Sequence, residues 1–293
     1  MFPIDYIEPV FRPPSEARSL ILPVTNGCSW NQCTFCEMYT APQKKFHTRN
    51  IETIREELSR VAALNIPIRR IFLADGDAMT LSFRRLHEIM TLINHYFPHI
   101  ERVSSYCLPR NIANKSVEEL QELREMGLKL VYVGCESGDD LVLQKIHKSE
   151  TFVSSEEALL QLGEAGIKRS VMILNGLGGM AYSHQHAINS ARLMNGTQPE
   201  YLSVLVLNFP NGKQRLQQDF PEFVMPDTMA LLDEMVVFIE SLNLNKTIFR
   251  SDHASNYVVL KGILNQDQDR LLAQIDNAKR HPETLRPEWA RGL

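Results

Sequence analysis

Six strand-like apolar runs alternate with amphipathic helical segments along the chain, and this alternation constrains the fold more than any other feature. The expected strands cover residues 19–24, 70–74, 103–108, 128–135, 168–176 and 201–208. No Asn-Gly or Asp-Gly pair lies between two of these runs as a hairpin turn would, so we expect parallel strands joined by right-handed crossovers. The sequence therefore predicts an α/β fold, either a closing barrel or an open doubly wound sheet.

Helix signals lie between these runs. Asn50 can cap a helix that starts at residue 51, and Ser116 with Glu119 has the pattern of a capping box for another helix, which Gly127 should end. Further helical segments are expected around residues 83–93, up to 166, and around 184–194, 229–242 and 266–279.

Polar motifs follow four of the expected strands. They are Gly27-Cys28, Asp75-Gly76-Asp77, Glu136-Ser137-Gly138 and Asn175-Gly176. In parallel α/β folds, ligands bind at the carboxyl ends of the strands. We therefore expect these motifs to face one common mouth.

The composition is that of an ordinary globular protein, with 293 residues, 44% of them hydrophobic, 23% charged, and a formal net charge of -4. This balance offers no basic face for nucleic acid and no polybasic segment for a membrane surface. Residues 1–19 do not have the pattern of a secretory signal. The longest apolar runs are far shorter than the ~20 residues of a membrane span. The expectation is a soluble, cytoplasmic protein.

Three of the five cysteines, Cys28, Cys33 and Cys36, lie within nine residues in a C-x4-C-x2-C pattern. An odd number of cysteines in a reducing compartment argues against a disulfide framework. Three thiolates on one loop can hold three corners of a cubane iron–sulfur cluster and leave its fourth iron free to bind a small molecule. Cys107 and Cys135 stand apart and are interpreted as small buried residues.

Zinc is the alternative metal for these cysteines. Cys3His zinc sites are common, and His47 is available as a fourth ligand. Zinc sites usually pair two C-x2-C knuckles, however, and only one is present here.

The cysteine loop resembles that of the radical S-adenosylmethionine (SAM) superfamily, whose usual signature is C-x3-C-x-Φ-C, with Φ aromatic, directly after the first barrel strand. This chain keeps the preceding strand and the final Thr34-Phe35-Cys36, but has four residues where three are usual. The resemblance spans roughly residues 19–211. It implies a partial (β/α)6 TIM-like barrel with a small C-terminal extension, a [4Fe-4S] cluster on the three cysteines, and SAM as cofactor.

The turn after the second strand resembles the superfamily's Gly-Gly-Glu motif. By this resemblance Asp75, Gly76 and Asp77 bind the amino group of the methionine part of SAM, and Phe35 also belongs to the cofactor site. A carboxylate suits an ammonium group, and glycine allows a close approach. The alternative is a polar turn that caps the next helix.

Residues 134–148 resemble a pattern of the coproporphyrinogen dehydrogenases and methylthiotransferases, Gly-x-Glu-Ser-Gly followed by a basic residue. The resemblance implies that Glu136 binds the ribose hydroxyls of SAM and that Lys148, twelve residues later, pairs with its carboxylate. Leu174, at the glycine-containing turn after the fifth strand, would lie near the adenine. The alternatives are a helix N-terminal charge for Glu136 and a solvated residue for Lys148.

The same resemblance implies the reaction. An electron from a ferredoxin or flavodoxin would enter through the cluster and cleave SAM, and the resulting 5'-deoxyadenosyl radical would abstract hydrogen from a substrate. A small-molecule substrate is favoured over nucleic acid, because the chain has no basic face. The substrate's identity stays open. So do two other functions, a zinc-stabilised binding protein without catalysis and an iron–sulfur electron-transfer or sensor protein.

Three parts of the chain are expected: an N-terminal arm over residues 1–18, the core barrel over 19–225, and an extension over 226–293 packed on the core. The extension carries a dense polar run that contains Arg250, His253 and Asn256. If the extension covers the barrel mouth, these residues contact substrate. If it packs on the rim, they are hydrogen-bonding turn residues.

Overall fold

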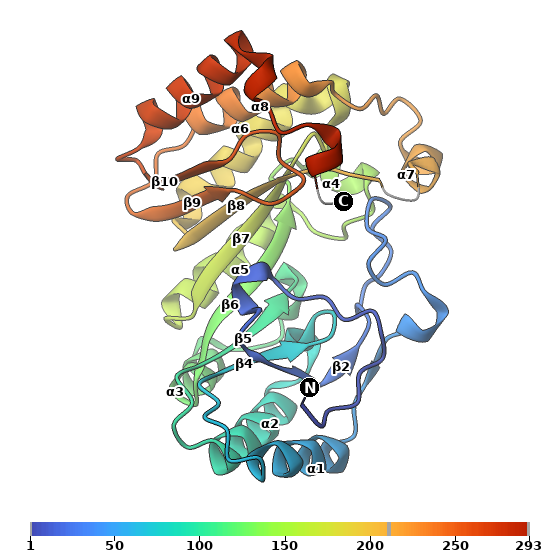
Figure 1. The fold of residues 1–293 in the computed structure, drawn as a ribbon, viewed down its shortest axis with the longest axis vertical. Helices are drawn as coiled ribbons and strands as arrows, with labels where there is room; N and C mark the ends of the chain where they lie inside the picture. The colour runs from blue at the N-terminus through green and yellow to red at the C-terminus, as the bar shows by residue number, and fades with distance from the viewer. Residues whose placement is uncertain (1, 210–211, 292–293) are drawn as a thin grey trace. The chain divides into compact units, whose positions relative to one another are not determined.

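The structure is a computed structural model that describes residues 2–209 and 212–291 (Figure 1). Eight strands of this part of the chain form one mostly parallel sheet, in the order β1-β4-β5-β6-β7-β8-β9-β10. Their bounds are Leu20–Pro23, Arg70–Ala74, Arg102–Cys107, Leu128–Glu136, Lys168–Asn175, Tyr201–Val206, Thr247–Ser251 and Leu260–Leu264. The predicted α/β class is confirmed, and the sheet is consistent with a partial TIM-like barrel.

Six of these strands, β1 and β4 to β8, coincide with the six expected runs. Pairing is parallel from β1 through β4 and β5 to β6, and from β7 through β8 to β9. β10 pairs antiparallel with β9. Neither β9 nor β10 was expected, because each buries only part of its residues, and a polar segment separates them.

The first of two compact units comprises Met1–Asn31, Cys36–Val133 and Leu160–Arg169. It holds the helices α1 (Ile51–Ala62), α2 (Phe83–Tyr96) and α3 (Val117–Glu125), and a small antiparallel pair, β2 (Thr25–Asn26) with β3 (His47–Thr48). Its core includes fully buried β4 residues and the apolar face of α1, namely Ile71, Phe72, Leu73, Ile54, Leu58 and Val61. Burying each such side chain contributes roughly 1.5–3 kcal/mol.

The helix ends of this unit follow the local signals in the sequence. The side chain of Asn50 accepts a hydrogen bond from the backbone N–H of Glu52 and caps α1. Ser116 and Glu119 form both hydrogen bonds of a capping box at the start of α3. Gly127 follows α3 with a φ of 118°, a left-handed conformation that favours glycine.

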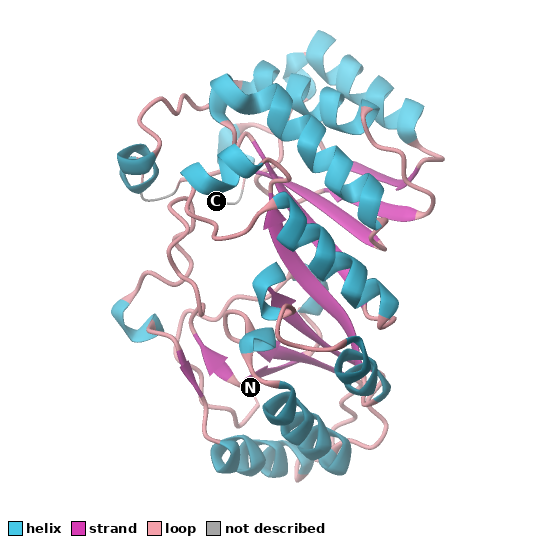
Figure 2. Ribbon diagram, turned by 180° about the vertical axis from the view of Figure 1, so that it is seen from behind, coloured by secondary structure: helices cyan, strands magenta, loops and turns pink. Residues whose placement is uncertain are grey.

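The second unit comprises Gln32–Phe35, Gly134–Leu159 and Ser170–Leu293. It holds α4 (Asp140–Lys145), the first part of α5 (Phe152–Glu164), α6 (Gly179–Thr197), α7 (Gln214–Asp219), α8 (Thr228–Glu240) and α9 (Gln268–Arg280), and the end of α5 belongs to the first unit. Helix α8 packs between α6 and α9, and α9 also contacts β10. Figures 1 and 2 show these three long helices as a layer beside β8, β9 and β10.

Membrane insertion through a helix has no support in the described residues. None of their helices combines the length and the apolar character that a bilayer span requires.

Candidate functional site

The cysteine loop begins at a glycine whose conformation and surroundings leave no room for a side chain. Gly27 has a φ of 72°, and a β-carbon there would lie 2.0 Å from the carbonyl oxygen of Lys44. Further along the loop, Asn31 is also left-handed, with a φ of 46°. Asparagine tolerates this region better than most residues.

None of the three cysteines of the loop forms a disulfide bond. Cys33 is buried, whereas Cys28 and Cys36 are partly exposed. Burial and the negative charge of Asp77 raise the pKa of Cys28 to about 11. The thiol therefore stays protonated at neutral pH unless a bound cation stabilises the thiolate, which is the form that ligates metal.

The structure gives a mononuclear zinc site no support. Among the described residues, no group of three or more Cys, His, Asp or Glu side chains is arranged to hold a metal ion. His47, the fourth ligand considered for zinc, lies exposed on β3, and its Nδ1 is 3.0 Å from the carbonyl oxygen of Lys45. A cubane cluster requires a different arrangement, because its three thiolates bind three separate irons.

The turn after β4 packs directly on the start of the cysteine loop. Gly76 has a φ of 77°, and a β-carbon there would lie 1.8 Å from the carbonyl oxygen of Gly27. The N–H of Gly76 donates to Oδ1 of Asp75 at 2.9 Å and to the hydroxyl of Tyr39 at 3.2 Å. The carboxylate of Asp75 forms a buried ion pair with Lys44. These contacts fix the turn that the sequence associates with the amino group of SAM.

Asp77, the last residue of this turn, also contacts the cysteine loop. Its carboxylate accepts hydrogen bonds from the backbone N–H of Ser29 at 2.7 Å, from the Ser29 hydroxyl, and from Nδ2 of Asn111 at 3.1 Å. Burial raises the pKa of Asp77, and the hydrogen bonds from Ser29 and Asn111 oppose that rise. Because Ser29 follows Cys28, Asp77 fixes the backbone beside the first of the three cysteines.

Three residues of this network, Lys44, Tyr39 and Asn111, were missed by sequence reasoning. A lysine in a polar loop is normally exposed, so nothing local marks Lys44 as fully buried. Nothing in the sequence around Tyr39 marks it as part of this network either. Asn111 lies shortly after β5, and its position just beyond a strand end was the signal that could have found it.

The two charged residues predicted after the fourth strand lie side by side. Glu136 ends β6 and is 5% exposed, Lys148 is 4% exposed, and Lys148 Nζ is 3.3 Å from Glu136 Oε1. The other oxygen, Glu136 Oε2, is buried and has no hydrogen-bond partner among the described residues. Burial raises the pKa of Glu136 despite the opposing effect of the Lys148 ammonium.

The backbone at this pair is strained in three places. Glu136 has a φ of 67°, and the residues on either side of Lys148, which are His147 and Ser149, have φ values of 54° and 61°. A left-handed conformation costs a non-glycine residue about 1–3 kcal/mol and is found disproportionately at functional sites. This strain, which cannot be read from the sequence, is a further reason to treat the pair as a candidate site.

Leu174 and Phe35, both expected in the cofactor site, are brought together in one apolar cluster. The buried members are Leu174, Val142, Leu143, Ile146, Leu177, Leu207, Leu216, Phe220 and Phe223, and Phe35 packs against them. The end of β7 is anchored by buried His186, whose Nε2 is 3.0 Å from the carbonyl oxygen of Leu174 and whose Nδ1 is 2.7 Å from the Ser137 hydroxyl.

The three residues considered for substrate contact serve different roles. Arg250 is exposed on β9, with Asp252 at 3.7 Å. The ring nitrogen Nδ1 of His253 lies 2.9 Å from the Ser255 hydroxyl. Asn256 is buried, and its amide group is bonded to the backbone of β8. His253 thus bonds within its own turn, whereas Asn256 bonds to Val204 and Val206 of β8, which are 52 and 50 residues away in the sequence.

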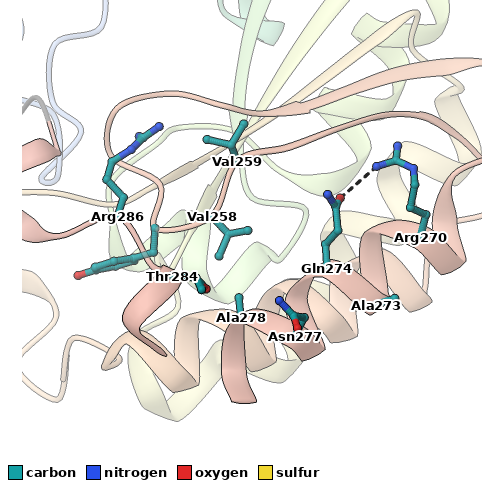
Figure 3. Close-up of a pocket in the computed structure, with 10 residues that line it drawn as sticks. Val258, Val259, Arg270, Ala273, Gln274, Asn277, Ala278, Thr284 and Arg286 are labelled. Atoms are coloured by element: carbon teal, nitrogen blue, oxygen red, sulfur yellow. Dashed lines mark hydrogen bonds between the residues drawn. The ribbon is translucent and has the colours of Figure 1, made fainter. Parts of the chain in front are cut away.

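Two pockets, each of about 560 Å3, lie in the second unit. One is formed by α9, residues 257–259 and the chain near Arg286, and Figure 3 shows Arg270 and Gln274 of α9 hydrogen-bonded at its edge. The other lies beyond the end of β8 and has an apolar wall of Leu207, Phe209 and Met225. These three residues belong to or pack on the cluster around Leu174, so the second pocket adjoins the residues predicted to lie near the adenine.

Comparison with protein families supports the resemblance seen in the sequence. The model described as the radical SAM superfamily matches residues 22–191, which is more than half of the chain. The heme chaperone HemW of Bacillus subtilis (strain 168) is 27% identical over 157 residues, which cover 52% of this chain and 41% of HemW.

Solved structures share the fold at low sequence identity. Coproporphyrinogen III oxidase (HemN) from Escherichia coli matches with a TM-score of 0.58 and 16% identity, over 76% of this chain and 52% of that chain. The radical SAM methyltransferase TsrM from Kitasatospora setae matches with a TM-score of 0.52 and 20% identity, over 64% of this chain and 36% of that chain. This chain thus spans about half or less of the length of each of these three proteins.

Proposed function

The chain belongs to the radical SAM superfamily, and we propose that it is an enzyme that holds a [4Fe-4S] cluster on Cys28, Cys33 and Cys36 and cleaves SAM reductively. The matched region, residues 22–191, contains the cysteine loop, the 75–77 turn and the Glu136–Lys148 pair. The 75–77 turn follows β4 and Glu136 ends β6, and both are strands of the parallel sheet, at whose strand ends α/β folds bind their ligands.

The observation that carries the proposal is the unpartnered oxygen of Glu136. A buried hydrogen-bonding group without a partner costs about 1–3 kcal/mol, and more when it is charged. The ribose of SAM would supply hydroxyl donors to Glu136 Oε2, and the neighbouring ammonium of Lys148 would attract the carboxylate of SAM. The residues present therefore fit the cofactor by their chemistry.

The donor set of the loop likewise fits an iron–sulfur cluster. Three cysteines without a disulfide within nine residues are suited to three irons, and this number leaves one iron for the amino and carboxylate groups of SAM. Asp77 holds the backbone beside Cys28 through Ser29, so one expected ligand is held in place before a cluster is present.

When bound, these groups would supply the reaction, which is one-electron cleavage of SAM followed by hydrogen abstraction from the substrate. The chain's own task is to orient the cofactor and to exclude water. Phe35 and Leu174 provide apolar contact for the adenine, and the wall formed by Leu207, Phe209 and Met225 continues this apolar surface into the adjoining pocket. We propose that this pocket receives a small-molecule substrate.

The proposed partner is a ferredoxin or flavodoxin that delivers the electron. Cleavage of each SAM molecule needs one electron from outside the chain, and these two carriers supply electrons singly. Replacing the natural donor by a chemical reductant keeps the central test independent of the partner's identity.

The test is purification under anaerobic conditions, followed by reconstitution with iron and sulfide. We expect about four irons and four sulfides per chain, and formation of 5'-deoxyadenosine when the protein is reduced in the presence of SAM. Cys28→Ala, Cys33→Ala and Cys36→Ala should each lose the intact cluster and the cleavage of SAM. Cys107→Ala, which alters a buried cysteine outside the loop, is the matched control and should keep both.

Two results would replace this function by one of its alternatives. About one equivalent of zinc without labile sulfide would indicate a zinc-stabilised binding protein. An intact cluster that neither binds nor cleaves SAM would indicate electron transfer or sensing.

A further inference from the structure

Lys44 is a fully buried lysine whose three N–H groups all find acceptors. Its ammonium donates to the carboxylate of Asp75 and to the carbonyl oxygen of Ile7, and Oδ1 of Asn26 lies 3.4 Å away. An ammonium group has three donors, so this set is complete. The three acceptors come from the turn after β4, the N-terminal segment and β2.

The backbone of Lys44 is fixed as firmly as its side chain. Nδ2 of Asn26 donates to the carbonyl oxygens of Gln43 and Lys45, at 2.9 and 3.1 Å, and so holds the chain on both sides of Lys44. The carbonyl oxygen of Lys44 in turn packs against Gly27, where a β-carbon would approach it to 2.0 Å. Lys44 therefore touches the start of the cysteine loop through its backbone and the 75–77 turn through its side chain.

Stability alone does not account for such a residue. Replacing a buried ion pair by apolar residues of similar volume is often neutral or stabilising, so the pair is weak evidence of a stabilising role. An ammonium with three directed donors does fix three separate segments relative to one another. Here the segments include the turn expected to bind the methionine part of SAM.

We propose that Lys44 is a positioning residue for SAM. By holding Asp75, it sets the orientation of the Asp75-Gly76-Asp77 turn against Gly27 and Cys28, and so sets where the turn meets the cofactor relative to the cluster. The carboxylate of Asp75 is already paired with the ammonium of Lys44. It therefore contributes to SAM binding by fixing the conformation of the turn, and not by attracting SAM with an unpaired charge. This inference rests on the proposed function.

The experiment compares four variants of the full chain. Lys44→Met removes the charge at similar length, Lys44→Arg keeps it, and Lys44→Met with Asp75→Asn removes both charges of the pair. Glu57→Gln is the control, because it disrupts the buried Arg49–Glu57 ion pair of the same unit. Three quantities are measured: amide hydrogen exchange at residues 27–29 and 75–77 without cluster, the urea midpoint, and SAM affinity of the reconstituted protein.

We expect Lys44→Met to keep its iron and sulfide, to exchange these amides about tenfold faster, and to bind SAM about ten- to a hundredfold more weakly. Lys44→Arg should recover part of this loss. The double variant should regain the wild-type urea midpoint without regaining SAM affinity. Glu57→Gln should lower the midpoint and leave SAM affinity unchanged.

The inference is overturned if Lys44→Met binds SAM as wild type does, or if the double variant restores midpoint and affinity together, since Lys44 would then only neutralise Asp75. If Lys44→Met does not fold, the double variant is the test, and recovery of both its urea midpoint and its SAM affinity would overturn the inference. A wild-type protein that binds no SAM would refute the proposed function and the inference with it. If the wild-type protein binds SAM and Lys44→Met binds it equally well, the inference is refuted and the proposed function is not.

Discussion

The ammonium of Lys148 lies 3.3 Å from one carboxylate oxygen of Glu136, while the other oxygen of the same carboxylate is buried without a partner in the described part of the chain. Only one of the two oxygens of this carboxylate therefore has a hydrogen-bond partner among the described residues. Gly134 makes room for it, because a β-carbon there would lie 2.4 Å from the oxygen that faces Lys148. A ligand that brings hydroxyl donors would complete the hydrogen bonding of this carboxylate.

Glu136→Gln should weaken SAM binding while leaving the cluster in place. The amide retains the shape of the side chain but loses the charge, and a hydrogen bond to a charged group is worth about 1.5–3 kcal/mol, which corresponds to a roughly ten- to hundredfold loss of affinity. The measurement is equilibrium binding of SAM to the reconstituted variant, alongside its iron and sulfide content. We also expect a lower urea midpoint, because Lys148 remains buried without its counter-charge.

The matched control for this substitution is Glu222→Gln. Glu222 also pairs with a lysine of the second unit, Lys145, but this ion pair is solvent-exposed. SAM affinity and urea midpoint should both stay at wild-type values. Equal affinity losses in Glu222→Gln and Glu136→Gln would contradict a specific role for Glu136.

Gly76→Ala should prevent the cysteine loop from taking its native conformation. The added methyl group would meet the carbonyl oxygen of Gly27 at 1.8 Å, and alanine disfavours the φ of 77°. We expect little or no cluster after reconstitution, measured as iron and labile sulfide per chain. Gly127→Ala is the control, since its φ is also positive but the nearest atom would be 3.7 Å away. Because of this φ it should cost about 1–3 kcal/mol of stability, and it should retain the cluster.

Much of the fold could be predicted because its determinants are local or periodic. Strands such as β4 are buried along nearly their whole length and appear in the sequence as continuous apolar runs. Helix starts were predicted from single caps such as Asn50. β9 escaped prediction because two of its three buried residues, Thr247 and Ser251, are polar, so its sequence shows neither a continuous apolar run nor a regular apolar–polar alternation.

The residues of the candidate site also fall into two groups, those that the sequence reveals and those that only the packing reveals. The cysteines, Glu136 and Lys148 belong to short motifs that the sequence displays directly. The burial of Lys44 cannot be read from its surroundings in the sequence, because its ammonium binds Asp75 and Ile7, which are 31 and 37 residues away. The unpartnered oxygen of Glu136 is likewise a consequence of packing, since it depends on which donors fail to reach it.

His253 should make stability depend on pH in a defined window. Burial, together with the positive charge of Arg286, lowers the pKa of His253 from its ordinary 6.5. Between the lowered value and 6.5 the unfolded chain binds more protons than the folded chain, so this residue makes the free energy of unfolding rise with pH through that window and adds no slope above it. In His253→Gln the rise should be smaller, measured as urea midpoints of the cluster-free protein from about pH 5 to 8. Identical pH profiles for the two proteins would contradict this assignment.

Asn256→Ala should destabilise the protein more than any change at the neighbouring Arg250. Oδ1 of Asn256 accepts from the N–H of Val206 at 2.8 Å, and Nδ2 donates to the carbonyl oxygen of Val204 at 2.9 Å, so the buried side chain bonds the end of β8 as a neighbouring strand would. Alanine leaves both buried backbone groups unpaired, at a cost of about 2–4 kcal/mol.

The urea midpoint of the cluster-free protein measures this cost, and Asn256→Asp, which places a buried carboxylate oxygen against the carbonyl oxygen of Val204, should lower the midpoint at least as much as alanine does. Arg250→Ala, at an exposed side chain, should change stability by no more than about 0.5 kcal/mol. If Asn256→Ala instead has the urea midpoint of the wild-type protein, the amide of Asn256 does not stabilise the end of β8. The alternative role of Asn256, contact with substrate, would then be favoured. The two roles are therefore separated by stability alone, before any substrate is known.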